Sequence, residues 1–144
     1  MVRTGQPVQP GQMHAVTLPT VPDSVRIARR TTAVTMAEFD VPVGSSFVDA
    51  AMLIVSELVT NAVRHAAKRS PSVAVVITVR VDQVVLEVAD EDPRIPDLDP
   101  GTTGEGLRTV VELAAEWGGE VRVEPPLTGK GKIMRVTLPL PRGR

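Results

Sequence analysis

With 144 residues the chain is long enough for one domain and too short for two, and its 16 basic and 17 acidic residues nearly cancel, which disfavours nucleic acid as a partner. The absence of cysteine excludes disulfide frameworks, thiolate zinc sites and cysteine nucleophiles, and two histidines alone cannot form a dedicated metal site. No apolar run reaches the ~18 residues of a membrane span and the first residues lack the apolar segment of a signal peptide, so we expect a cytoplasmic protein with no membrane partner.

The first forty residues are predicted to form a tail, a strand and a helix. Residues 1–12 are rich in Pro, Gly and Gln and are expected to be a disordered tail, so that the domain comprises residues 13–144. "MHAVTLP" (13–19) contains enough β-forming residues for a short strand. The segment 22–39 spaces its apolar residues as a helix does, with Asp23 or Ser24 as the expected N-cap.

The middle of the chain predicts a longer helix followed by a hairpin. Pro42 and Gly44 interrupt the first helix, and Ser45 or Ser46 can cap a second one that runs to about Lys68. "VAVVITVRV" and "QVVLEVAD" then read as two strands joined by a turn near Asp82 and Gln83.

The last third predicts a long loop, a helix and two strands. "EDPRIPDLDPGTTGEG" has three prolines and three glycines in sixteen residues, which is typical of a functional loop. "LRTVVELAAEWGG" carries an apolar helical stripe that ends at a glycine pair, and "EVRVEPP" and "GKIMRVTLPL" are β-rich. The element order indicates an α+β fold of two layers, with a mixed, mostly antiparallel sheet and the helices on one face.

Polar residues recur every four positions along the second helix, in "SELVTNAVRHA" (56–66). Glu57, Asn61 and His65 therefore form one ridge on an otherwise apolar helix. The ridge can be an ordinary solvated face. It can also be functional, because the Asn61 carboxamide suits Mg²⁺ shared with substrate phosphates, and the Glu57 carboxylate could orient or deprotonate an attacking hydroxyl or water.

Two further stretches carry possible chemistry. Asp90, at the end of a β-rich run, can be a turn former, or it can accept a hydrogen bond from an amine such as that of adenine. "GTTGEGL" (101–107) precedes a helix, whose N-terminal amides attract phosphate; the alternative is a flexible linker with a capping glycine. It is neither a Walker loop nor a dinucleotide fingerprint, since no Gly-Lys-Ser/Thr follows it and no strand leads directly into it.

Taken in this order, "ELVTNAVRH", "DEDPR" and "GTTGEGL" resemble the N box and the two glycine boxes of the GHKL ATP-binding domain of histidine kinases, gyrase, Hsp90 and MutL. The resemblance is strongest to small bacterial anti-sigma-factor serine/threonine kinases, and it covers about residues 13–140. It implies the two-layer Bergerat fold, with ATP and Mg²⁺ as cofactors.

The resemblance also implies roles for individual residues. Glu57 would be the catalytic base, Asn61 the Mg²⁺ ligand and His65 a residue near the phosphates. Asp90 would contact the adenine amine. The end of the second glycine box would pack near the phosphates through Gly104, Gly106 and Leu107.

The chain departs from the family pattern at three positions. Asp92 and Arg94 stand where the first glycine box has glycines, and Lys132 stands where relatives often have threonine. Two functions therefore stay open: a partner-switching kinase that binds a sigma factor and phosphorylates an antagonist protein, or a catalytically silent module that sequesters a regulator. A homodimer is compatible with both. Arg64 and Arg108 fit better as solvated residues than as site residues, Trp117 as core, and His14 as structural or exposed.

Overall fold

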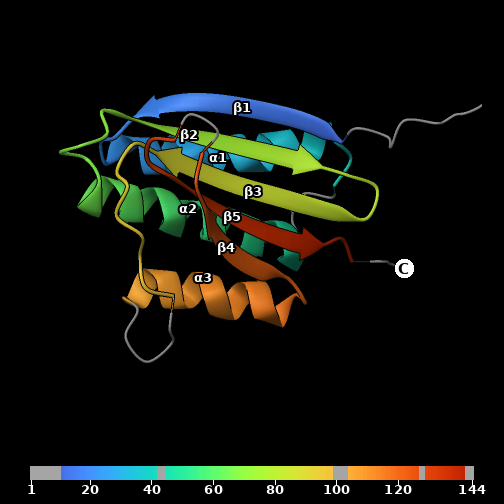
Figure 1. Cartoon of the computed structure of the whole chain (residues 1–144). Helices are drawn as coiled ribbons and strands as arrows, with labels where there is room; N and C mark the ends of the chain where they lie inside the picture. Colours follow the sequence, from blue (N-terminus) through green and yellow to red (C-terminus); the bar gives the residue numbers. More distant parts are fainter. Residues whose placement is uncertain (1–10, 42–44, 99–103, 127–128, 142–144) are drawn as a thin grey trace, which may run out of the picture.

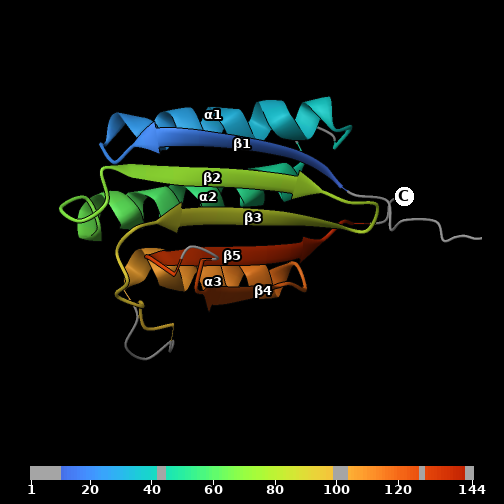
Figure 2. The same cartoon turned by 45° about the horizontal axis from the view of Figure 1, so that its top comes forward.

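The computed structural model describes residues 11–41, 45–98, 104–126 and 129–141 and forms two layers. Along the chain the elements are β1 (Gln12–Pro19), α1 (Asp23–Glu38), α2 (Ser46–His65), β2 (Ser72–Val79), β3 (Gln83–Asp90), α3 (Glu105–Glu116), β4 (Glu120–Glu124) and β5 (Lys132–Pro139). One five-stranded sheet has the order β1-β2-β3-β5-β4, and the helices lie against one of its faces (Figures 1 and 2). The predicted α+β architecture is confirmed.

All four strand pairings in the described part of the chain are antiparallel. The prediction of a mostly antiparallel sheet therefore holds, while the parallel pair that a mixed sheet would contain does not occur among these strands. The reason lies in β5. Helix α3 returns the chain so that β4 runs in the same direction as β3, but β5 pairs with both of them and separates the two.

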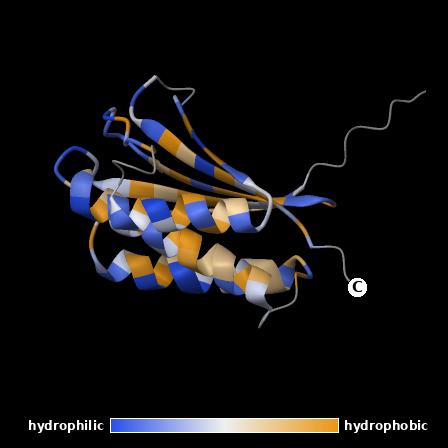
Figure 3. Cartoon of the chain, turned by 90° about the horizontal axis from the view of Figure 1, so that it is seen from below, coloured by the Kyte–Doolittle hydropathy of each residue, from blue (hydrophilic) through white to orange (hydrophobic). Residues whose placement is uncertain are grey.

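The core lies between the sheet and α2, the central helix. Residues on the inner face of β3 alternate with more exposed ones, as the twofold period of a strand requires, and β2 and β5 follow a similar pattern. Helix α2 buries Ile54, Leu58 and Val59 against them and contacts α1 and α3 on either side. Figure 3 shows the resulting alternation of apolar and polar segments along the helices.

Local signals explain how the helices begin and end. Ser45 caps α2 as predicted, since its hydroxyl accepts a hydrogen bond from the Val48 amide at 3.3 Å. The cap predicted for α1 is wrong: Pro22 holds that position without a side-chain bond, and the buried Ser24 hydroxyl instead donates to the Pro19 carbonyl at 2.6 Å. A proline suits a helix start because its φ is already fixed.

Other boundaries shift by a few residues. Helix α2 ends at His65, short of the predicted Lys68, and α3 begins at Glu105, two residues earlier than predicted. The predicted glycine end of α3 is confirmed: Gly118 has a φ of 77°, and the amides of Gly118 and Gly119 donate to the last-turn carbonyls of α3. Most of the predicted tail, residues 1–10, lies outside the described residues, and its last residue, Gln12, begins β1.

By length and composition α2 is the single helix, within the described residues, that could cross a membrane. This is weak evidence, because the core helix of a globular domain passes the same test, and α2 is the helix that carries the core. The absence of a membrane partner stays a prediction.

Candidate functional site

The polar ridge of α2 lines a cavity of about 380 Å³. Glu57, Thr60 and Asn61 are half-buried on this face, and Arg64 and His65 are exposed at its end. Because the opposite faces of α2 pack against the sheet and the neighbouring helices, this ridge is the side of the helix left for polar groups. The volume falls within the range of small-molecule sites.

The start of α3 closes another side of the same cavity. Gly104, Glu105, Gly106 and Leu107 all line it, so "GEGL" and the α2 ridge share one cavity, as the family resemblance implies. A Cβ placed on Gly106 would lie 2.7 Å from Glu57 Oε1, which is how closely the two elements approach. Residues 101–103 of the predicted glycine box lie outside the described residues. The convergence of these two stretches is established, while the roles of their side chains stay predictions.

Asp90 lies behind the cavity rather than in its lining. It is the last inward-facing residue of β3, so it is buried on the helix side of the sheet with 8% exposure. Its Oδ1 accepts a hydrogen bond from the Asp92 amide at 2.8 Å and another from Lys132 Nζ at 3.0 Å. The carboxylate that the resemblance assigns to adenine thus has partners within the protein.

Lys132, which the sequence marked only as a departure from the family pattern, belongs to this wall of the cavity. It pairs with Asp90 in the register of β3 and β5, lines the cavity, and donates to the Asp92 carbonyl at 3.0 Å. Gly131 makes this possible, because a Cβ there would sit 1.9 Å from the Asp90 carbonyl oxygen. The signal in the sequence was the Gly-Lys pair at the start of a β-rich run, but only the strand register identifies its partner.

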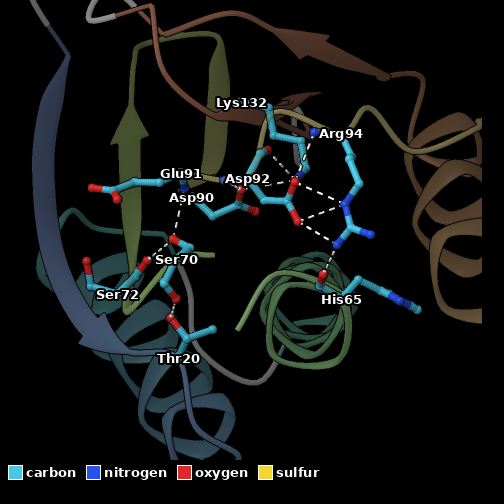
Figure 4. A network of polar contacts seen from close by, with 9 residues as sticks. All are labelled: Thr20, His65, Ser70, Ser72, Asp90, Glu91, Asp92, Arg94 and Lys132. Carbon is cyan, nitrogen blue, oxygen red and sulfur yellow. Dashed lines mark hydrogen bonds and ion pairs between the residues drawn. The ribbon is translucent and has the colours of Figure 1, made fainter. Parts of the chain in front are cut away.

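Asp92 and Arg94 form a second, bidentate ion pair on the same wall (Figure 4). The Arg94 guanidinium contacts Asp92 Oδ2 at 2.6 and 3.0 Å and also donates to the His65 carbonyl at the end of α2. Asp92 is 1% exposed, and the hydrogen bonds from Arg94 hold the pKa of its carboxyl far below the usual range despite burial. The same contacts raise the pKa of Arg94. Arg94 thus ties the loop after β3 to α2.

Hydrogen bonds of Ser70 anchor the beginning of this loop (Figure 4). The buried Ser70 hydroxyl accepts from the Glu91 amide at 2.8 Å and donates to the Ser72 carbonyl at 2.7 Å. Its own carbonyl accepts from the Thr20 hydroxyl at 2.6 Å. The segment that carries Asp92 and Arg94 therefore leaves the sheet from a fixed point.

Comparison with known proteins shows the family to which the chain belongs. Residues 48–142, more than half of the chain, match the family model described as "Histidine kinase-, DNA gyrase B-, and HSP90-like ATPase". The chain belongs to this ATPase family. The matched range includes the α2 ridge and the start of α3, to which the motif resemblance assigns the N box and the second glycine box, and that assignment stays a prediction.

Two solved structures, from Mycobacterium tuberculosis and Acinetobacter baumannii, agree on the fold. The RsbU and RsbW domains of Rv1364c from Mycobacterium tuberculosis match with a TM-score of 0.66 at 20% identity, over 92% of this chain and 33% of that one. The histidine kinase AdeS of Acinetobacter baumannii matches at 0.54 and 14% identity, over 91% and 70%. A histidine kinase domain from Erythrobacter litoralis EL346 is 30% identical over 65% of this chain and 44% of that one, with a TM-score of 0.49. The chain spans less than half the length of the Mycobacterium tuberculosis and Erythrobacter litoralis proteins.

The described residues suit a metal ion that is shared with a ligand. They contain no group of three or more His, Asp or Glu side chains able to hold a metal by themselves. Mg²⁺ commonly takes one or two protein oxygens and completes its shell with water and phosphate, and the half-buried Asn61 carboxamide on the cavity wall fits that requirement.

The remaining predicted residues lie outside this cavity, except Arg64, which lines it. Trp117 packs on the core, as predicted. Its ring centroid lies 5.4 Å from that of Phe47. It lines a larger cavity of about 930 Å³ at the opposite end of β3, which contains none of the predicted site residues. His14 and Arg108 are exposed.

Proposed function

We propose that the chain is a Mg²⁺-ATP-binding regulatory protein that acts as an anti-sigma-factor-type serine/threonine kinase in a partner-switching pathway. The observation that carries this proposal is the shared cavity of Glu57, Asn61 and the Gly104–Leu107 turn, with Gly106 packed directly against the Glu57 carboxylate. A base, a metal ligand and phosphate-binding amides are the parts that phosphoryl transfer needs in one place.

Each part has a role in this proposal. The Asn61 carboxamide oxygen binds Mg²⁺, and the amides at the start of α3, with His65 nearby, hold the phosphates. Glu57 accepts the proton of a serine or threonine hydroxyl while that oxygen bonds to the γ-phosphorus. The bond from the γ-phosphorus to its bridging oxygen breaks, and ADP leaves.

The proposed partners are proteins. The similarity to an RsbU–RsbW protein, together with the resemblance of the sequence motifs to anti-sigma-factor kinases, supports a sigma factor or its antagonist as partner. We also propose a cytoplasmic location and no direct contact with nucleic acid or membrane, in keeping with the near-neutral charge of −1. A homodimer is compatible with this function.

A labelling assay tests the proposal. The protein is incubated with Mg²⁺ and γ-labelled ATP beside candidate antagonist proteins, and label transfer is scored for wild type, Glu57→Ala and the control Glu112→Ala. Glu112 is a glutamate of α3 outside the cavity. Loss of a general base should reduce transfer by about 10²–10⁴-fold and leave ATP binding nearly unchanged, whereas Glu112→Ala should behave as wild type. Undiminished transfer by Glu57→Ala would remove Glu57 from the mechanism.

A second function is favoured by the Asp92–Arg94 pair. These residues stand at two glycine positions of the first box and form an ion pair there. The Asp92 carboxylate is buried, and the Arg94 guanidinium also donates to the His65 carbonyl. Such a wall fits a catalytically silent module that sequesters a protein partner. Calorimetric titration with Mg²⁺-ATP separates the two functions. A Kd of about 1 mM corresponds to a binding free energy of only about −4 kcal/mol, so absence of binding at about 1 mM nucleotide favours the silent module.

A further inference from the structure

The cavity wall formed by Asp92, Arg94 and Lys132 is charged, yet its charges already have partners. Lys132 Nζ donates to Asp90 Oδ1 and to the Asp92 carbonyl, both at 3.0 Å. The Asp92 carboxylate accepts from Arg94 Nε and Nη2. Both ion pairs have a buried carboxylate, and the ammonium of Lys132 is buried as well.

This pairing of charges matters for ligand selection. A site rejects a wrong ligand strongly when that ligand leaves buried polar groups of the protein unpaired. Here the buried carboxylates keep their partners whichever base is bound. A base that lacks a particular donor or acceptor therefore incurs no such penalty at this wall.

We propose that the site holds its ligand through the triphosphate and Mg²⁺ and does not select adenine, and that Lys132 is the residue that sets this lack of selectivity. The inference rests on the proposed nucleotide-binding function. It concerns the end of the ligand away from Glu57, Asn61 and the start of α3.

Lys132 has this effect through its position between the cavity and Asp90. It lines the cavity, whereas Asp90 does not, and the two face each other across β3 and β5. Shortening Lys132 to threonine opens the path to Asp90 and removes the ammonium that pairs with it. The freed buried carboxylate then requires a donor, and the 6-amino group of adenine can supply one.

Inosine triphosphate is the sharpest probe, because it differs from ATP only in having a keto oxygen in place of the 6-amino group, with the accompanying ring proton. Affinities for Mg²⁺-ATP and Mg²⁺-ITP are measured by calorimetry for wild type, Lys132→Thr and Lys130→Thr. Lys130 is a matched control, since its side chain is 74% exposed and lies outside the cavity. We expect the wild-type and Lys130→Thr affinities for the two nucleotides to agree within about threefold, and Lys132→Thr to prefer ATP by about tenfold or more.

The outcomes separate the two claims. A wild-type preference of tenfold or more for either nucleotide overturns the inference while leaving nucleotide binding in place. An unselective wild type with an equally unselective, folded Lys132→Thr overturns the role given to Lys132. Failure of both nucleotides to bind wild type overturns the proposed function and this inference with it. Thermal unfolding of each variant checks its fold, and if Lys132→Thr does not fold, the wild-type ratio still decides whether adenine is selected.

Discussion

Replacing Gly106 by alanine should disturb the chemistry of the site without disturbing the fold. The added Cβ would lie 2.7 Å from Glu57 Oε1 and 3.7 Å from its Cδ, with no backbone atom among its close neighbours. The atom it meets is the end of a flexible side chain, so the carboxylate can move aside. The φ of Gly106 is not positive and the residue lies in α3, where alanine is the better helix former.

The size of the effect follows from this contact. An ordinary contact begins at 3.4 Å, so the carboxylate oxygen must shift by about 0.7 Å from its 2.7 Å position. A displacement approaching 1 Å in a catalytic group can lower a rate by up to about 10²-fold. We therefore expect a loss of phosphoryl transfer of about ten- to a hundredfold. The free energy of unfolding should stay the same or rise by up to about 1 kcal/mol.

Label transfer and urea unfolding measure the two effects, and Gly104→Ala is the matched control. A Cβ on Gly104 meets nothing within 4 Å, and this residue lines the same cavity. Its alanine variant should keep transfer within a few-fold of wild type and lose about 1 kcal/mol of stability through the weaker N-cap. Equal transfer by Gly106→Ala and Gly104→Ala would refute the idea that the Glu57 position controls catalysis.

Two further predictions concern stability. Arg94→Gln should lower the free energy of unfolding at neutral pH. Because Arg94 lowers the pKa of folded Asp92, this stabilisation is complete above the unfolded-state pKa of about 3.9 and fades as pH falls below it. In urea unfolding, the difference in unfolding free energy between wild type and variant should be the same at about pH 7 and 5 and smaller at about pH 3. A difference that grows in acid contradicts the assignment. Phe47→Ala removes a ring that is 2% exposed and packed edge-on against Trp117, so denaturation should show a loss of about 3–5 kcal/mol. A loss below about 1 kcal/mol would show that this end of α2 is not part of the core.

The sequence predicted the helices and strands well because their signals are local. The apolar stripe of α2 and its Ser45 cap identify that helix, and the glycine pair after Trp117 ends α3. The cap of α1 could not be predicted, since Ser24 satisfies a carbonyl of β1 instead of its own helix. The insertion of β5 between β3 and β4 depends on pairing between distant segments, which no local pattern encodes.

The site shows the same division between local and long-range information. The four-residue spacing of Glu57, Asn61 and His65 is enough by itself to predict that they share one face of a helix. The contact of Lys132 with Asp90 joins residues 42 positions apart and depends on strand register and on Gly131. The sequence therefore indicated that Asp92, Arg94 and Lys132 were unusual, but not that their charges are paired along one wall of the cavity.

The central claim is that α2 and the start of α3 form a Mg²⁺-nucleotide site. Titration of the wild-type protein with ATP in a calorimeter, once with Mg²⁺ and once with EDTA, tests it most directly. We predict saturable binding with one nucleotide per chain in Mg²⁺, weakened by about tenfold or more in EDTA because the Asn61 carboxamide and the phosphates lose their shared cation. Binding that is equally strong in EDTA would contradict the metal site, and no binding in either buffer would contradict the claim as a whole.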